Sequence, residues 1–130
     1  MIVVDASAVA DALLDGGDRG RWAAEALRRE DLHAPQLVDY EVVAVIRKWT
    51  LLRKTSPAKA EQALAELGWL PMRRYPAAPF VNRIWALRTS VTAYDAAYVA
   101  LAEALRCPLV TTDLRLAHAH GHDAEIRSPV

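Results

Sequence analysis

The sequence predicts an α/β domain of three layers, in which helices cover both faces of a central, mostly parallel sheet. Short apolar runs, each long enough for one buried strand, alternate along the chain with longer segments whose apolar residues recur at helical spacing. A strand that is followed by a helix and then by another strand of the same sheet gives a parallel pair with a helix packed against it. This alternation predicts the fold class.

The first part of the chain contains two predicted strands and two predicted helices. Residues 2–4, Ile-Val-Val, are a β-branched run that predicts a buried strand. Apolar residues at helical spacing predict one helix around 8–13 and a second around 22–27. Residues 32–34 then predict the second strand.

The rest of the chain continues this alternation. Apolar residues recur at i, i+4, i+7, i+8 and i+11 from Val38, which predicts a helix over 37–53. Ser56 as N-cap and Pro57 at the first helical position begin another helix, which is expected to end near Gly68. Further strands are expected at 69–72, 108–111 and 124–126, and further helices at 77–88, 92–105 and 113–120.

Composition favours a single domain over residues 1–130 in a reducing cytosol. A chain of this length buries about two-thirds of the surface that its unfolded form exposes.

Lys+Arg and Asp+Glu both number 16, so the net charge is zero and any contact with nucleic acid has to be local. Cys107 is the single cysteine and cannot form an internal disulfide. No apolar run approaches the ~18 residues that a membrane span needs, so we expect a cytoplasmic protein that is neither exported nor membrane-spanning.

Four carboxylates stand where a globular protein normally places apolar or small residues: Asp5, Glu41, Asp95 and Asp113. Asp5 and Asp113 follow predicted strands, and open parallel sheets bind ligands beyond the carboxyl ends of their strands. Carboxylates that converge from distant segments repel one another unless a cation neutralises them. Since an all-oxygen set of ligands favours hard cations, the pattern predicts a Mg²⁺ or Mn²⁺ site.

Three of these acids also have a purely structural interpretation. Asp5 and Asp113 each precede a predicted helix and are good N-cap residues. Asp95 is the fourth residue of Thr-Ala-Tyr-Asp, a pattern like a capping box, although it is also in register with Tyr98 and Val99 on the apolar face. Capping and metal binding both remain open for these three acids.

Glu41 separates the two interpretations best. It lies three residues after Val38 and four before Val45, on a helix face that should be buried. Burying an unpaired carboxylate is costly, so a counter-charge is required. A buried Arg or Lys is the alternative to a metal ion, but Arg47 and Lys48 lie on other faces of the same helix.

The ordered set of motifs around these acids resembles the PIN-domain nucleases, and in particular the VapC toxins of toxin-antitoxin systems. Its parts are Ile-Val-Val-Asp-Ala-Ser at 2–7, Glu41 in the helix after the second strand, the run from Thr92 to Ala102, and Leu-Val-Thr-Thr-Asp at 109–113. The resemblance covers the whole chain and implies a PIN-like fold. It departs after Asp113, where many members carry a further Asp or Asn and this chain continues Leu-Arg-Leu.

The resemblance also implies an activity. The metal-binding and catalytic residues would be Asp5, Glu41, Asp95 and Asp113, supported by the hydroxyls of Ser7, Thr111 and Thr112. The implied enzyme is a Mg²⁺- or Mn²⁺-dependent endoribonuclease that hydrolyses RNA phosphodiester bonds. It would form a homodimer and be inhibited by a cognate VapB-like antitoxin. The alternative is a catalytically inert PIN-like binding module that acts through dimerisation or nucleic-acid contact.

Three other groups of side chains are weaker candidates. The alternating histidines would splay apart on a helix, which favours a solvated helix end over a metal site: His118, His120 and His122. Two basic groups are candidates for RNA contact or plain solvated surface: Arg47-Lys48 with Arg53-Lys54, and Arg73-Arg74. Spacing assigns the tryptophans mainly to the core, with some as candidates for a partner groove: Trp22, Trp49, Trp69 and Trp85.

Overall fold

The computed structural model describes residues 1–129 and contains a five-stranded sheet in which every pairing is parallel. The strand order is β3-β2-β1-β4-β5, with β1 at the centre. The strands are β1 (Ile2–Val4), β2 (Leu32–Pro35), β3 (Met72–Tyr75), β4 (Leu109–Val110) and β5 (Ile126–Arg127). The predicted parallel sheet is confirmed.

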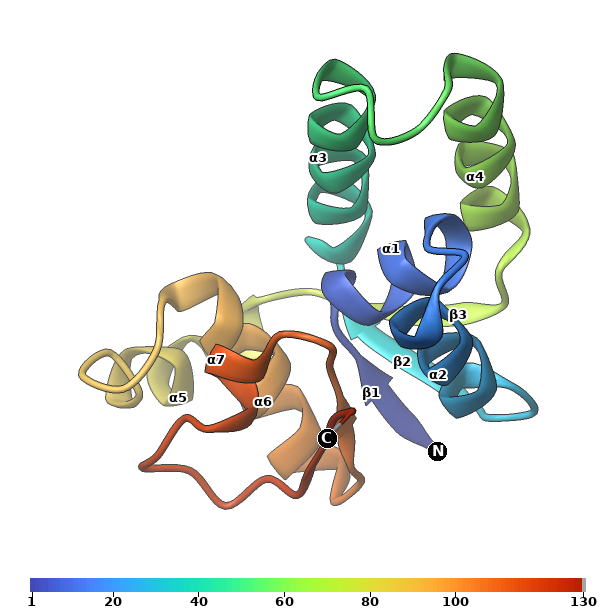
Figure 1. Ribbon diagram of the computed structural model, residues 1–130. Coiled ribbons are helices and arrows are strands. Elements are labelled where there is room, and N and C mark those ends of the chain that lie inside the picture. The colour runs from blue at the N-terminus through green and yellow to red at the C-terminus, as the bar shows by residue number, and fades with distance from the viewer. Residues whose placement is uncertain (130) are drawn as a thin grey trace.

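Helices lie on both sides of this sheet. They are α1 (Ala6–Leu14), α2 (Asp18–Leu27), α3 (Val38–Leu51), α4 (Pro57–Trp69), α5 (Val81–Ala86), α6 (Ala93–Leu105) and α7 (Leu114–Ala117). α6 packs against β1, β2 and β4, whereas α1 packs against α2, α3 and α4. In Figure 1, α5, α6 and α7 lie on one side of β1, α1 and α2 lie on the other, and α3 and α4 project together away from the sheet. The three-layer α/β/α prediction is confirmed. None of the helices in residues 1–129 is long and apolar enough to cross a membrane.

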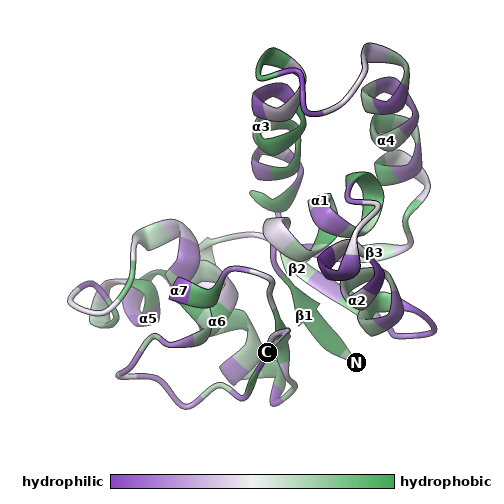
Figure 2. Ribbon diagram, viewed as in Figure 1, coloured by the Kyte–Doolittle hydropathy of each residue, from purple (hydrophilic) through white to green (hydrophobic). Residues whose placement is uncertain are grey.

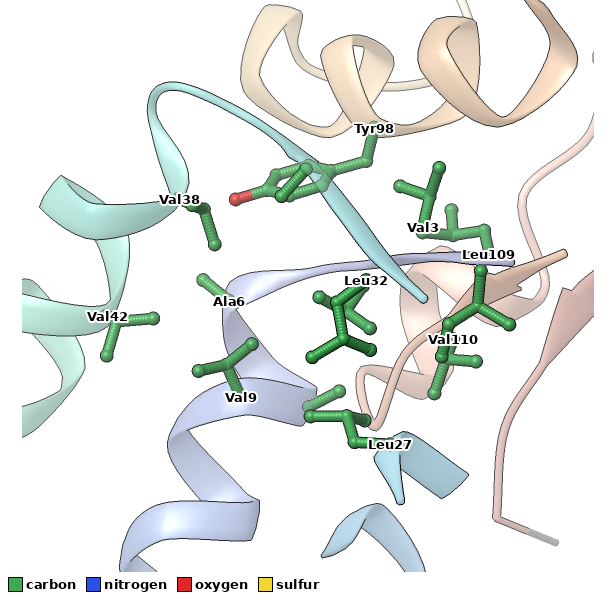
Figure 3. Packing of buried hydrophobic residues seen from close by; sticks show 14 of the residues in the cluster. Val3, Ala6, Val9, Leu27, Leu32, Val38, Val42, Tyr98, Leu109 and Val110 are labelled. Atoms are coloured by element: carbon green, nitrogen blue, oxygen red, sulfur yellow. The ribbon is translucent and has the colours of Figure 1, made fainter. Parts of the chain in front are cut away.

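The core lies on both faces of β1. The three residues of β1 are at most 1% exposed, as expected of a central parallel strand. Residues 96–102 of α6 are buried throughout. Figure 2 shows β1 in hydrophobic colours, while α2 and α4 carry hydrophilic turns. Figure 3 shows Val3 and Tyr98 on the α6 side of β1, and Val9 and Leu27 on the other side.

Several element boundaries differ from the sequence-based predictions. α4 continues through Gly68 to Trp69, so the third strand begins at Met72 rather than at 69. The residue before a proline is pushed toward extended backbone, and Leu70, directly before Pro71, has φ −68° and ψ 118°. Proline rather than glycine therefore ends this helix. The helix expected over 77–88 is divided into a 3₁₀ turn (Ala78–Phe80) and α5, and α7 ends at Ala117 rather than at 120.

The prediction that the tryptophans belong mainly to the core is wrong for two of them. Trp69 is 87% exposed and Trp85 is 66% exposed. Trp69 is the last residue of α4, and Trp85 lies in the short helix α5, where neither side chain reaches the core. Trp22 and Trp49 are half-buried and pack against the core.

The topology brings four chain segments toward one edge of the sheet. Asp5 directly follows β1, and residues 111–113 follow the adjacent parallel strand β4. Glu41 lies in the first turn of α3, and Asp95 lies in the first turn of α6. The predicted site residues therefore lie near one another at the carboxyl edge of the sheet.

Candidate active site

Asp5 is a buried carboxylate that is held by three hydrogen bonds. As the N-cap of α1 it accepts the backbone N–H of Ala8 at 3.0 Å. The hydroxyls of Ser7 and Thr111 donate to its two oxygens at 2.6 and 2.5 Å. Burial raises the pKa of Asp5 to about 6, although these hydrogen bonds lower it, and the charge of Asp113 adds to the rise. Capping is thus confirmed for Asp5, but it does not provide the positive charge that this buried acid lacks.

Asp113 is the N-cap of α7, so its predicted capping role is also confirmed. Its Oδ1 accepts the backbone N–H of Arg115 at 2.9 Å, and its own backbone N–H donates to Oγ1 of Thr111 at 3.0 Å. Thr111 therefore joins the two acids that follow β1 and β4. The charge of Asp113 raises the pKa of both Asp5 and Asp95.

Glu41 is half-buried, and the hydroxyl of Tyr98 donates to its Oε1 at 2.7 Å. Burial raises the pKa of Glu41, the Tyr98 hydrogen bond lowers it, and the charge of Asp95 raises it further. Within residues 1–129 no Arg, Lys or His forms a salt bridge with Glu41. The alternative to a metal ion, a buried Arg or Lys paired with Glu41, is therefore not found in the part of the chain that the structure describes.

Asp95 is half-buried in the first turn of α6, where the Thr92 hydroxyl caps the helix by accepting the Asp95 backbone N–H at 3.2 Å. Burial raises the pKa of Asp95, the charge of Arg115 lowers it and the charge of Asp113 raises it. The Nη2 atom of Arg115 lies 3.6 Å from Asp95 Oδ2 and 3.4 Å from Asp113 Oδ2. One guanidinium therefore bridges two of the four acids.

The four acids are connected in a series by charge repulsion. Charge repulsion links Asp5 with Asp113, Asp113 with Asp95, and Asp95 with Glu41. As their side chains lie, however, no three His, Cys, Asp or Glu residues among residues 1–129 are grouped so that they could hold a metal ion. The predicted acids are thus neighbours that do not converge on one point.

A fifth acid, Asp11, is hydrogen-bonded into the same network of acids and hydroxyls. It was not among the site residues predicted from the sequence. It is only 5% exposed and accepts the Thr112 hydroxyl at 2.6 Å and Nε of Arg19 at 2.9 Å. The backbone N–H of Thr112 in turn donates to Oγ of Ser7 at 3.1 Å. A signal was available, because Asp11 lies three residues from Ala8 and from Leu14 within an apolar helix, as Glu41 does within its own helix.

Two clefts open beside the acids. The aromatic cleft, of about 830 Å³, is lined by Ser7, Asp11, Asp18, Arg19, Trp22, Val45, Trp49, Thr112, Asp113, Leu114 and Pro129. The basic cleft, of about 650 Å³, is lined by Arg88, Thr89, Ser90, Val91, Thr92, Asp95, Arg115, Leu116, His118, Ala119 and His120. Each cleft includes one of the four acids, so both lead to the same edge of the sheet.

The sequence and fold of this chain are similar to those of known proteins. The sequence profile of the PIN domain matches residues 2–121. The chain belongs to the PIN-domain family. Ribonuclease VapC12 of Mycobacterium tuberculosis is 44% identical over 126 residues, which are 97% of each chain. The chain is therefore a VapC-type PIN domain, as its motifs predict.

Two solved structures share the fold of this PIN domain. PAE2754 from Pyrobaculum aerophilum superimposes with a TM-score of 0.70 at 24% identity and covers 96% of this chain and 81% of that one. VapBC2 from Rickettsia felis, solved bound to a DNA fragment from their promoter, gives a TM-score of 0.66 at 14% identity over 98% of both chains. At these identities the likeness supports the fold.

The donor set of this VapC-type PIN domain suits a hard divalent cation, because all four acids offer oxygen atoms. The charges agree, since burial and mutual repulsion raise the pKa of Asp5, Glu41 and Asp95. The Arg115 guanidinium bridges Asp95 and Asp113 and supplies part of the positive charge that a bound cation would bring. The residues therefore fit a divalent cation in chemistry and charge. The Arg115 guanidinium lies beside two of the acids that would hold the cation.

Proposed function

We propose that this VapC-type PIN domain is an endoribonuclease that hydrolyses RNA phosphodiester bonds, with Mg²⁺ or Mn²⁺ held by Asp5, Glu41, Asp95 and Asp113. The observation that carries the proposal is that Asp5 is buried and Glu41 half-buried at the carboxyl edge of the sheet, and that neither forms a salt bridge with a basic residue in residues 1–129. Repulsion from another of the four acids, which adds to the rise in the pKa of Asp5, Glu41 and Asp95, supports it. A divalent cation offsets both burial and repulsion. The relative VapC12 is named a ribonuclease, which supports RNA as the substrate.

The chain's own residues prepare the acids for this role. Bound Mg²⁺ or Mn²⁺ supplies Lewis acidity for an in-line displacement at phosphorus. Ser7 and Thr111 fix both oxygens of Asp5 by hydrogen bonds. Tyr98 fixes one oxygen of Glu41, and among residues 1–129 no protein group donates to its other oxygen. Figure 3 shows the Tyr98 hydroxyl pointing toward Val38, at the beginning of the helix that carries Glu41.

We also propose the partners and compartment that belong to this function: a homodimer in the cytoplasm that a VapB-like antitoxin inhibits. The Rickettsia felis relative was solved as VapBC2, which supports such a partner. The paired helices α3 and α4 and the turn after α3 expose several apolar side chains, as a protein partner requires: Val43, Leu51, Leu52, Leu64 and Trp69. The alternative of an inert binding module draws no support from relatives that are named ribonucleases.

Cleavage of RNA by the purified chain tests the proposal. The wild-type chain is expected to cut single-stranded or structured RNA with Mg²⁺ or Mn²⁺ and to stop in EDTA. Asp5→Asn and Asp95→Asn should lower the rate by about 100-fold or more while the chain stays folded. The matched control is Asp123→Asn, which changes an exposed acid beside the far end of α6, where its backbone N–H donates to Glu103. Equal cleavage by the wild type and both site variants would indicate a contaminating nuclease and refute the proposal.

A further inference from the structure

We propose that the basic cleft carries the RNA backbone to the four acids, an inference that rests on the proposed ribonuclease function. The cleft begins at Asp95 and Arg115, which belong to the acid site. It continues between the loop 88–92 and the segment 116–120. An RNA strand that lies in this cleft would therefore place a phosphodiester bond beside the acids.

The charge of the basic cleft suits a polyanion. Its ionisable lining consists of Asp95 and Arg115, which form a salt bridge at 3.6 Å, the cation Arg88 and two exposed imidazoles, His118 and His120. The loop 88–92 adds the hydroxyls of three residues, Thr89, Ser90 and Thr92. Cations and hydroxyls are the groups that contact the sugar-phosphate backbone of nucleic acids.

Arg88 is the residue in this cleft that is best prepared to bind a phosphate. Its guanidinium lies 4.5 Å from the ring centroid of Trp85, and its Nη1 donates to the Trp85 carbonyl at 3.1 Å. No carboxylate in residues 1–129 pairs with it. Stacking therefore holds this cation at the cleft without neutralising it. The exposed Trp85 ring offers a surface for a base beside the same position.

The aromatic cleft is the less suitable path. It has three carboxylates, Asp11, Asp18 and Asp113, and a single arginine, Arg19. Arg19 already forms a salt bridge with Asp11 at 2.9 Å. The lining of this cleft therefore offers a phosphate backbone no cation without a carboxylate partner, whereas the basic cleft offers Arg88.

Binding of a short, labelled single-stranded RNA of mixed sequence tests the path without any cleavage. Fluorescence anisotropy in EDTA is measured over a series of salt concentrations. Arg88→Gln is expected to weaken binding about tenfold and to reduce the log-log salt slope by about 0.7. Arg88→Lys keeps the charge and should keep most of the affinity. The matched control is Arg47→Gln, an exposed cation of α3 without a carboxylate partner in residues 1–129, and it should change neither value.

The outcomes separate this inference from the proposed function. Unchanged affinity and slope in Arg88→Gln, or an equal loss in Arg47→Gln, would overturn the path, even if the enzyme cleaves RNA. Binding that depends on Arg88, in a protein that cleaves no RNA with Mg²⁺ or Mn²⁺, would refute the proposed function and keep the cleft as a site for RNA. Thermal melts of each variant establish that the exposed substitutions leave the fold intact.

Discussion

The aromatic cleft and the basic cleft open beside the same acids but differ in what their charged groups do. In the aromatic cleft, Arg19 is committed to the buried Asp11, and two half-buried tryptophans line the wall. In the basic cleft, Arg88 rests on an aromatic ring, and Asp95 is the single carboxylate of the lining. The only arginine that lines the aromatic cleft is paired with an acid of its own wall. In the basic cleft Arg115 is likewise paired, with Asp95 and Asp113, but Arg88 has no carboxylate partner in residues 1–129 and is available to a ligand.

This difference shows why net charge says little about ligands of this chain. The totals of 16 basic and 16 acidic residues cancel. Several arginines are already neutralised, since Arg83 binds Glu103 through two hydrogen bonds of 2.8 Å, and similar pairs lie elsewhere on the surface. What matters for a polyanion is which cations lack a carboxylate partner and where the fold gathers them.

The largest expected effect distinguishes the glycines beside the two clefts. A Cβ on Gly20, next to Arg19, would lie 1.8 Å from the Asp15 carbonyl oxygen and 2.8 Å from that of Asp11. Backbone atoms cannot move aside easily, so Gly20→Ala should lower the free energy of unfolding by about 3 kcal/mol or more. Denaturant titration measures it. Gly68→Ala, where an added Cβ meets nothing within 4 Å, is the matched control.

Gly121 beside the basic cleft should tolerate the same change better. Its φ is +82°, and an added Cβ would lie 2.7 Å from Oγ of Ser90. That hydroxyl can rotate, so Gly121→Ala should cost about 1–2 kcal/mol, mainly from the left-handed backbone. A loss as large as that of Gly20→Ala would show that the backbone beside the basic cleft tolerates an added side chain no better than the backbone beside the aromatic cleft, and would contradict this expected difference.

The second effect concerns Asp5, the most deeply buried of the four acids. Burial raises the pKa of Asp5 from 3.8 to about 6, so between about pH 4 and pH 6 the folded state binds more protons than the unfolded state. Stability that is present at low pH is therefore lost as the pH rises through this window, by about 3 kcal/mol. Urea titrations in EDTA should show this fall for the wild type and a flatter curve for Asp5→Asn. Parallel curves would contradict the assignment.

The third effect compares one polar residue from each cleft. Asp11→Ala leaves the Thr112 hydroxyl and Arg19 without their acceptor, so we expect a loss of about 2 kcal/mol in the free energy of unfolding. Arg88→Ala removes an exposed side chain and should cost about 0.5 kcal/mol or less. Denaturant titration checks both. If Arg88→Ala were the more destabilising of the two, the charges of the basic cleft would be structural as well.

Much of the fold was predictable because its signals are local. The β-branched run Ile2–Val4 predicts strand β1, and the apolar residues at helical spacing in α6 predict that helix, in each case from a few consecutive residues. Glu41 was found for the same reason, since a charge interrupting an apolar stripe is visible in the sequence. Its partner Tyr98 was not found, because the two residues are 57 positions apart and Tyr98 looks like core.

The clefts were less predictable than the acids. The basic cleft is assembled from the loop 88–92, the first turn of α6, and α7 with the segment that follows it. No periodicity within one of these segments reports on the other two. Arg115 illustrates the point, because its contact with Asp95 depends on how the short helix α7 sits against α6. The basic residues that stand out in the sequence as candidates for RNA contact are different ones, including Arg74.

The last prediction concerns Arg74, for which no effect on RNA binding is expected. Arg74 donates to both oxygens of Asp39 at 2.6 and 2.9 Å, which joins β3 to α3. Its charge is therefore already balanced, as that of Arg19 is in the aromatic cleft. Arg74→Gln should lower the free energy of unfolding by about 0.5–1 kcal/mol and leave the RNA affinity and its salt slope unchanged. Anisotropy beside Arg88→Gln gives the comparison. A fall in the slope for Arg74→Gln would mean that paired cations also bind the backbone, and the distinction between committed and available charge would fail.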